Sequence, residues 1–183
     1  MGDTDITLVV CGAPLTTRTP DLVGALLADG WRPTVVGTPS ASAWLDVEAV
    51  ARLTGDAPRF DFRSPEQAKR GGPPAAVVVC PATFNTVNKA AVGASDTYAL
   101  AVLCEAMGTG IPTVLVPMVN NKLWGHPAWA GSLAVFRNAG VALVDIRTGH
   151  PDVEAVMSGT GGDVVARFQP AWVIAQLKRL LPR

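Results

Sequence analysis

One stretch near the middle of the chain, residues 77–86, constrains the fold more than any other. Its sequence is VVVCPATFNT. Four apolar residues run directly into Pro81, and a short apolar run ended by a breaker is typical of a strand buried on both faces. Ligands in an open parallel sheet bind beyond the carboxyl ends of the strands. The small and polar residues that follow Pro81 therefore place hydroxyl and amide groups where a ligand would lie.

Other short apolar runs of the same character alternate with helical patterns along the chain. Such alternation predicts the α/β class, with a mainly parallel sheet covered on both faces, and one domain over residues 1–183. Strands are expected at residues 6–11, 33–37, 113–116 and 141–144, with a further short strand possible at 59–62. Helices are expected at residues 19–30, 41–54, 86–92, 95–108 and 131–139 and from Pro170 onward, and residues 150–163 are loop-like.

Composition excludes several classes of partner. The formal net charge is zero, so no basic face indicates binding to nucleic acid or to an anionic membrane. No apolar run reaches the roughly 18 residues of a membrane span, and the acidic start of the chain lacks the basic region of a signal peptide. Three widely spaced cysteines are expected to be buried reduced thiols, which favours a cytoplasmic protein. With 49% apolar and 16% charged residues, the chain has either a large core or a surface covered in an oligomer.

The segments after the first two strands contain small and hydroxyl-bearing residues. Residues 12–18 connect the first strand to a helix that begins at Thr19 and Pro20, an arrangement that binds anions in some proteins and is a plain turn in others. It lacks the G-x-G-x-x-G pattern of dinucleotide sites. Thr38 and Ser40 follow the second strand, where Ser40 would serve a ligand or cap the next helix.

Three separated stretches resemble the motifs of one family, the homo-oligomeric flavin-containing cysteine decarboxylases. Residues 81–86 (PATFNT), followed by Lys89 and Asp96, resemble its PASANT motif. Residues 117–124 (PMVNNKLW) are similar to its P-x-M-N-x-x-M-W motif, and residues 38–41 resemble its T-x-S-A segment. The order and spacing fit from the first strand to the last helix, so the resemblance covers most of the chain.

The resemblance implies a Rossmann-like three-layer sandwich that binds FMN. It also implies assembly into trimers, often gathered into dodecamers, with the flavin at a subunit contact. Members act on cysteine carboxylates, either phosphopantothenoylcysteine in coenzyme A synthesis or the C-terminal cysteine of a peptide antibiotic precursor. They oxidise the thiol end to a thioaldehyde-like species, and carbon dioxide then leaves to give an enethiol.

The matching positions imply specific roles. Asp96 would meet the flavin or cap the helix beside it, and the other residues implied to hold FMN are Gly12, Ala13, Thr38, Ser40, Thr83 and Thr86. Asn85 and Asn120 match the motif asparagines on the substrate side. Met118 and Trp124 would shape the substrate pocket, or simply pack in a core or interface. No metal site is expected.

The chain also departs from the family pattern. Phe84 replaces a small residue beside the flavin and would fill space. Family members carry a catalytic histidine about a dozen residues before the PASANT motif, and here Gln67 lies near that place. His126, just after the second motif, is the nearest replacement base in sequence; its alternative is a surface or interface histidine. Residues 158–170 lack the flap cysteine that the coenzyme A enzymes use.

These features lead to one leading hypothesis and two alternatives. The leading hypothesis is an FMN-dependent oxidative decarboxylase of a C-terminal cysteine in a peptide or a small cysteine conjugate, and the missing flap cysteine favours the peptide. The first alternative is an FMN-binding regulatory subunit without its own catalysis, which the missing histidine motivates. The second is an FMN oxidoreductase with an unrelated substrate.

Overall fold

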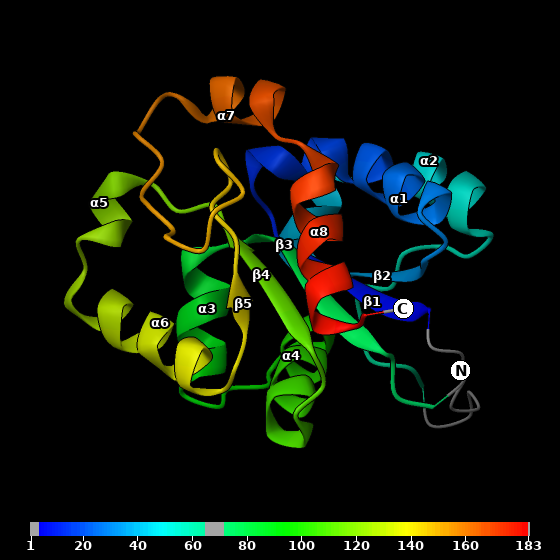
Figure 1. Cartoon of the computed structure of the whole chain (residues 1–183), viewed down its shortest axis with the longest axis horizontal. Helices are drawn as coiled ribbons and strands as arrows, with labels where there is room; N and C mark the ends of the chain where they lie inside the picture. Colours follow the sequence, from blue (N-terminus) through cyan, green and yellow to red (C-terminus); the bar gives the residue numbers. More distant parts are fainter. Residues whose placement is uncertain (1–3, 65–71, 183) are drawn as a thin grey trace.

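A sheet of five parallel strands forms the centre of the fold, seen in a computed structural model that describes residues 4–64 and 72–182. The strands lie in the order β2-β1-β3-β4-β5, and every neighbouring pair is parallel (Figure 1). The prediction of an α/β fold with a mainly parallel sheet is therefore confirmed. The strands are β1 (Asp5–Val10), β2 (Arg32–Gly37), β3 (Ala76–Ala82), β4 (Thr113–Pro117) and β5 (Ala142–Leu143).

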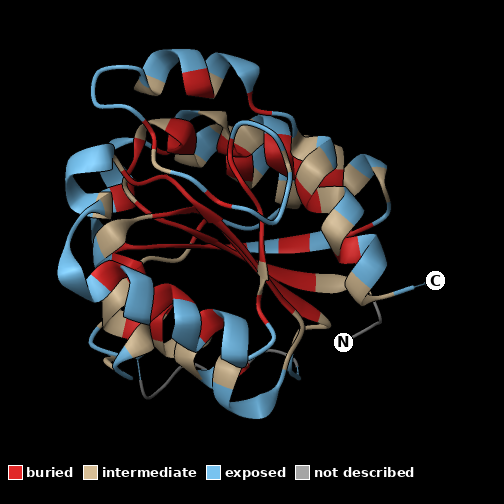
Figure 2. Ribbon diagram, turned by 60° about the vertical axis from the view of Figure 1, so that its left-hand side comes forward, coloured by how far each residue is buried: buried red, intermediate tan, exposed pale blue. Residues whose placement is uncertain are grey.

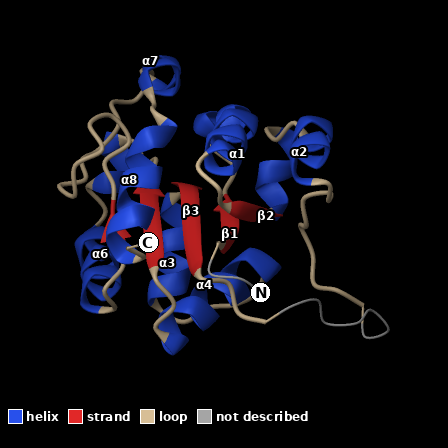
Figure 3. Ribbon diagram, turned by 45° about the vertical axis from the view of Figure 1, so that its right-hand side comes forward, coloured by secondary structure: helices blue, strands red, loops and turns tan. Residues whose placement is uncertain are grey.

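Helices cover both faces of this sheet (Figure 3). The first face carries α1 (Thr19–Ala28), α2 (Val47–Thr54), α7 (Gly161–Arg167) and α8 (Pro170–Leu180). The second carries α3 (Phe84–Ala91), α4 (Tyr98–Thr109) and α6 (Pro127–Asn138). Shorter pieces, η1 (Pro14–Arg18), η2 (Pro39–Ala43) and α5 (Asn121–Trp124), follow β1, β2 and β4. The result is the three-layer sandwich that the resemblance implied.

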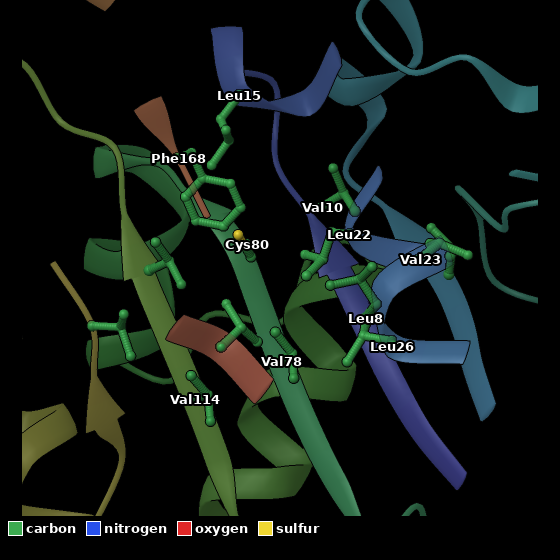
Figure 4. Close-up of a cluster of buried hydrophobic side chains, with 14 of the residues drawn as sticks. Leu8, Val10, Leu15, Leu22, Val23, Leu26, Val78, Cys80, Val114 and Phe168 are labelled. Carbon is green, nitrogen blue, oxygen red and sulfur yellow. The ribbon is translucent and has the colours of Figure 1, made fainter. Parts of the chain in front are cut away.

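Alternation along the central strands accounts for the two hydrophobic cores. Side chains of a strand point to opposite faces in turn, so Val78 and Cys80 of β3 enter the first core while Val77 and Val79 enter the second. Figure 4 shows the first core, where Leu8 of β1 lies beside Leu26 of α1 and Cys80 of β3 lies beside Phe168. In Figure 2 the buried residues concentrate in the sheet and on the inward faces of the helices. A sheet buried on both faces needs continuous apolar strands, which is the pattern that residues 77–80 display.

Two expected elements on the β2 side differ from the structure. The helix expected at residues 41–54 is divided, because η2 ends at Ala43 and α2 starts only at Val47. Asp46 sets the start of α2: its carboxylate accepts a hydrogen bond of 2.8 Å from the Ala49 N–H and so caps the helix. The short strand expected at residues 59–62 is reduced to a single bridge between Arg59 and Val36.

Helix starts on the β3–β4 side also differ from expectation. The N-cap of α4 is Thr97, whose hydroxyl accepts from the Leu100 N–H, so the helix starts later than residue 95 and Asp96 does not cap it. Helix α6 starts at Pro127 rather than at residue 131, since proline suits the first helical position. Helix α3 starts at Phe84 rather than at residue 86, and α5 and α7 form in segments where no helix was predicted.

The three cysteines are free, as predicted, although only two of them are fully buried. Cys11 and Cys80 enter opposite cores, and burial raises the pKa of both thiols. Within residues 4–64 and 72–182, no helix has the length and apolar character needed to cross a membrane. The same residues contain no cluster of three side chains suited to holding a metal ion.

Candidate functional site

A cleft of about 580 Å³ lies where the carboxyl ends of four strands meet. The chain passes from β1 to β2 on one side and returns to β3 on the other, so the two halves of the sheet diverge between β1 and β3. In doubly wound sheets this switch point is where ligands bind. The cleft is lined by Gly12, Ala13, Pro14, Thr38, Pro39, Ser40, Trp44, Thr83, Phe84, Asn85, Thr86, Lys89, Thr97, Leu100, Met118, Val119, Asn120 and Leu123.

The β1–β2 side of the cleft depends on a close approach between two backbones. The Thr38 N–H donates to the Val10 carbonyl at 2.9 Å and so extends the pairing beyond β2. The hydroxyls of Thr38 and Ser40 lie 3.1 Å apart. A Cβ added to Gly12 would lie 2.5 Å from the Ser40 carbonyl oxygen, far inside contact distance. Only glycine at position 12 therefore allows this wall to form.

The β3 side presents hydroxyls at the start of α3. Thr83 is the N-cap residue, but its side chain does not cap the helix; its hydroxyl instead lies 3.1 Å from that of Thr86. The first N–H groups of α3 therefore lack the usual cap acceptor. Burial raises the pKa of the Cys11 thiol beneath them, against the opposing effect of its hydrogen bonds to Thr86 and Thr83. This corner offers N–H and O–H groups suited to an anion.

Asn120 forms the β4 side of the cleft, and its side-chain oxygen already accepts hydrogen bonds within the protein. Its Oδ1 accepts from the N–H groups of Lys122 and Leu123, at 3.1 and 3.0 Å, and so caps α5. The Asn120 side chain consequently has its NH₂ group, a donor, for a ligand. Its backbone is held from the other side by a bridge to Val156, and the Ser158 N–H donates to Asn121 at 2.9 Å.

Nine of the predicted site residues come together in this cleft. They are Gly12, Ala13, Thr38, Ser40, Thr83, Asn85, Thr86, Met118 and Asn120. Three others, Asp96, Trp124 and His126, are not among the lining residues. Asp96 forms an ion pair with Lys89 at 2.5 Å, and the ring of Trp124 packs 5.1 Å from that of Trp129. Gln67, near the place of the family histidine, lies outside the described residues.

The structure gives His126 a capping role. As the N-cap of α6, it accepts a hydrogen bond at Nδ1 from the Ala128 N–H at 3.1 Å, and its ring meets Phe84 edge-on at 5.5 Å between centroids. A neutral imidazole that accepts at Nδ1 carries its proton on Nε2 and has no second lone pair to remove a proton. To act as a base, His126 would first have to lose its hydrogen bond with the Ala128 N–H. The role of His126 as a catalytic base stays a prediction.

The cleft lining also includes residues outside the set predicted to bind cofactor or substrate. Phe84 was expected to fill space beside the flavin, and it both lines the cleft and stacks on Trp129 at 5.6 Å. Trp44 and Leu123 line the cleft with exposed apolar surface. Lys89 also lines the cleft. The sequence could have indicated this, because Lys89 lies three residues after Thr86 on α3 and residues three apart share a helix face.

The residues present fit a flavin nucleotide. The volume lies within the range of 300–1,000 Å³ usual for pockets that bind small molecules and cofactors. Hydroxyls and uncapped N–H groups at one corner suit a phosphate, and Met118, Leu100 and Phe84 offer apolar contact to a flat ring. The fold and site thus define a doubly wound α/β domain with a nucleotide-type cleft at its switch point.

Comparison with known proteins identifies the family. The family model described as Flavoprotein matches residues 1–169. The chain therefore belongs to the Flavoprotein family, and the recognition made from its motifs is confirmed.

Individual relatives agree with this assignment. The coenzyme A biosynthesis bifunctional protein CoaBC of Mycobacterium tuberculosis (strain H37Rv) is 31% identical over 105 residues, which cover 57% of this chain and 23% of that protein. CoaBC of Mycolicibacterium smegmatis is 25% identical over 180 residues, covering 96% and 41%. The chain thus spans less than half the length of the curated relatives it matches. The crystal structure of the FMN-dependent cysteine decarboxylase SpaF has a TM-score of 0.67 at 24% identity, covering 94% of this chain and 97% of that one, which shows a shared fold.

Proposed function

We propose that this chain binds FMN in the cleft and decarboxylates a C-terminal cysteine of a peptide or a small cysteine conjugate. The observation that carries the proposal is the convergence of Thr83, Asn85 and Asn120 on one cleft at the switch point of the sheet. Family membership supports FMN as the cofactor, and the proteins similar to this chain include a cysteine decarboxylase and a protein of coenzyme A biosynthesis. The missing flap cysteine favours the peptide.

The chain's own residues would bind and orient both molecules. Gly12, Ala13, Thr38, Ser40, Thr83 and Thr86 would hold FMN, which when bound supplies two-electron oxidation of the cysteine side chain. Asn85 and the free NH₂ group of Asn120 would donate to the substrate carboxylate and fix its position relative to the ring. Met118 and Phe84 would exclude water from the carboxylate and so favour loss of carbon dioxide.

Anaerobic mixing tests this proposal. The FMN-loaded protein is expected to lose its flavin absorbance when a peptide ending in cysteine is added, and the peptide should lose the mass of carbon dioxide and two hydrogens. The same peptide ending in serine, which has no thiol to oxidise, is the control and should leave the flavin oxidised. A broad panel of C-terminal cysteine peptides and conjugates that all remain intact would exclude the decarboxylase.

The absence of the family histidine from its usual region motivates a second candidate, an FMN-binding subunit without catalysis of its own. It differs from the first in needing a partner. The second candidate is supported if the purified chain is inert toward the panel and forms a stable complex with a different protein. Reduction of the bound flavin by NAD(P)H in stopped flow would instead indicate an FMN oxidoreductase with an unrelated substrate.

Assembly and location belong to the same proposal. We expect a homo-oligomer, a trimer or a dodecamer, because the chain is unusually apolar and exposes Trp44 and Leu123 beside the cleft. Light scattering after size-exclusion chromatography measures the subunit number directly. We also expect a single flavoprotein domain in the cytoplasm, which cell fractionation would test.

Asn120→Asp separates the two functions of this side chain. An aspartate keeps an acceptor for the Lys122 and Leu123 N–H groups, so α5 should remain capped and flavin affinity unchanged. It loses the amide donor and places a negative charge beside the substrate carboxylate. We expect kcat/KM to fall at least about tenfold, the effect of losing one hydrogen bond to a charged group. Steady-state kinetics at several substrate concentrations measure it, and an unchanged kcat/KM would remove Asn120 from substrate binding.

His126→Asn distinguishes a cap from a base. Asparagine is a good N-cap and can replace Nδ1 as the acceptor for Ala128. Since the geometry commits that nitrogen to the helix, we expect kcat within about twofold of the parent, whereas loss of a general base costs roughly 10²–10⁴-fold. Single-turnover flavin reduction measures the rate, and a loss in the larger range would assign proton transfer to the imidazole.

A further inference from the structure

Among the described residues that line the cleft, Lys89 is the one that carries a charge. The remaining lining side chains are hydroxyls, amides and apolar groups. Neutral donors can hydrogen-bond to a phosphate, but they carry no charge to balance it. A phosphate monoester carries about −1.5 to −2 charges at neutral pH. A phosphorylated ligand in this cleft therefore has Lys89 as its nearest source of positive charge among the lining residues.

Lys89 is placed to reach the corner built by Thr83 and Thr86. It lies three residues after Thr86 on α3, so both side chains share one face of the helix. Side chains on a helix lean toward its N-terminus, which for Lys89 is the direction of the uncapped start of α3. The lysine and the free N–H groups therefore face the same region of the cleft.

The present partner of Lys89 holds it weakly. Its Nζ lies 2.5 Å from the Asp96 carboxylate, but 37% of the lysine side chain and 57% of the aspartate side chain are exposed. Exposed ion pairs contribute little to stability because water screens them. When an anion enters the cleft, Lys89 can therefore leave Asp96, or bind both the anion and Asp96, at a small cost in free energy.

We propose that Lys89 binds the phosphate of FMN, and that Asp96 competes with the phosphate for it. The inference rests on the proposed function, since it takes FMN to be the ligand of this cleft. The proposal predicts opposite effects for the two residues. Removing the charge of Lys89 should weaken phosphate binding, and removing the charge of Asp96 should strengthen it. The Lys89 hydrogen bond lowers the pKa of Asp96, so the competitor is ionised at neutral pH.

Comparing FMN with riboflavin isolates the phosphate, because riboflavin is the same molecule without it. We would titrate the apoprotein with each flavin and measure affinity from the quenching of flavin fluorescence. For Lys89→Gln we expect FMN affinity to fall about tenfold, equivalent to ~1.4 kcal/mol, with riboflavin affinity unchanged. For Asp96→Asn we expect the ratio of FMN to riboflavin affinity to rise by about threefold. Added salt should reduce FMN affinity in the parent and much less in Lys89→Gln.

Lys122→Gln is the matched control, because it removes the same charge from an exposed lysine on α5 that does not line the cleft. It should leave both affinities unchanged. Equal losses of FMN and riboflavin affinity in Lys89→Gln would overturn the proposal, since they indicate a structural effect, and so would no change in either. A lysine that binds the substrate carboxylate instead would leave both flavin affinities unchanged and raise KM. A parent protein that binds neither flavin would overturn the proposed function as well, whereas one that binds both equally would overturn only the phosphate contact.

Discussion

Gly12→Ala is expected to remove tight flavin binding, with a loss of affinity on the order of 100-fold, equivalent to ~3 kcal/mol. The added methyl would lie 2.5 Å from the Ser40 carbonyl oxygen and 2.8 Å from its Oγ, so the segments after β1 and β2 must separate. That movement displaces the hydroxyls of Thr38 and Ser40 from the cleft. Overpacking of this kind also lowers the free energy of unfolding by about 1–3 kcal/mol.

Gly24→Ala provides the control for this substitution. Gly24 lies in the middle of α1, where an added Cβ would meet nothing within 4 Å. Alanine is the better helix former, so this variant should be as stable as the parent or more stable by up to about 1 kcal/mol. Fluorescence titration with flavin and chemical denaturation report the two effects separately. Parent-like flavin affinity in Gly12→Ala would show that the close approach to Ser40 does not support the cleft.

Asp145→Asn is expected to cause the largest loss of stability, about 3 kcal/mol. The Asp145 side chain is 1% exposed. Its Oδ1 accepts from the N–H groups of Arg147 and Thr148 and from the Thr148 hydroxyl, at 3.0–3.1 Å, while its Oδ2 accepts from the Glu154 N–H at 3.0 Å. An amide presents a donor on one side, so at least one of these partly buried N–H groups loses its acceptor and faces another donor, a cost of roughly 1–3 kcal/mol for each group.

This aspartate also supports the candidate site from a distance. It orders the segment after β5 that continues to Val156, and Val156 exchanges backbone hydrogen bonds with the Val119–Asn121 segment. Loosening that segment should therefore weaken the position of Asn120 as well as the fold. Urea denaturation measures the stability, and hydrogen exchange of the Asn121 N–H measures the local effect. Asp152→Asn, in an exposed position of the same segment, should change neither. Equal stability of both variants would contradict the argument.

The sequence was informative where local pattern and tertiary structure agree. Residues 77–80 predicted a buried strand because a continuous apolar run has few other places in an α/β protein, and the structure buries all of β3. The rule that ligands bind beyond the carboxyl ends of parallel strands placed Thr83 and Asn85 at a ligand site, and the family resemblance added Asn120. The motifs then narrowed the ligand to a flavin, which composition alone could not do.

What the sequence could not predict depends on side chains that compete for backbone groups. Asn120 and His126 each cap a short helical start, and these caps fix α5 and the beginning of α6. Residue type alone does not show whether such a side chain caps a helix or binds a ligand. The pairing of Lys89 with Asp96 joins α3 to the loop before α4, and no local pattern in the sequence indicates it.

If the proposed function holds, the cap formed by Asn120 determines how a peptide substrate would enter the cleft. Because its oxygen accepts from the backbone of α5, this side chain can donate a hydrogen bond to an incoming group but is not placed to accept one. The two termini of a peptide are therefore not equivalent here: an ammonium end meets another donor, whereas a carboxylate end finds a partner. The direction in which a peptide would bind is therefore set by Asn120, whose oxygen is used to cap α5 and whose NH₂ group is left to the ligand.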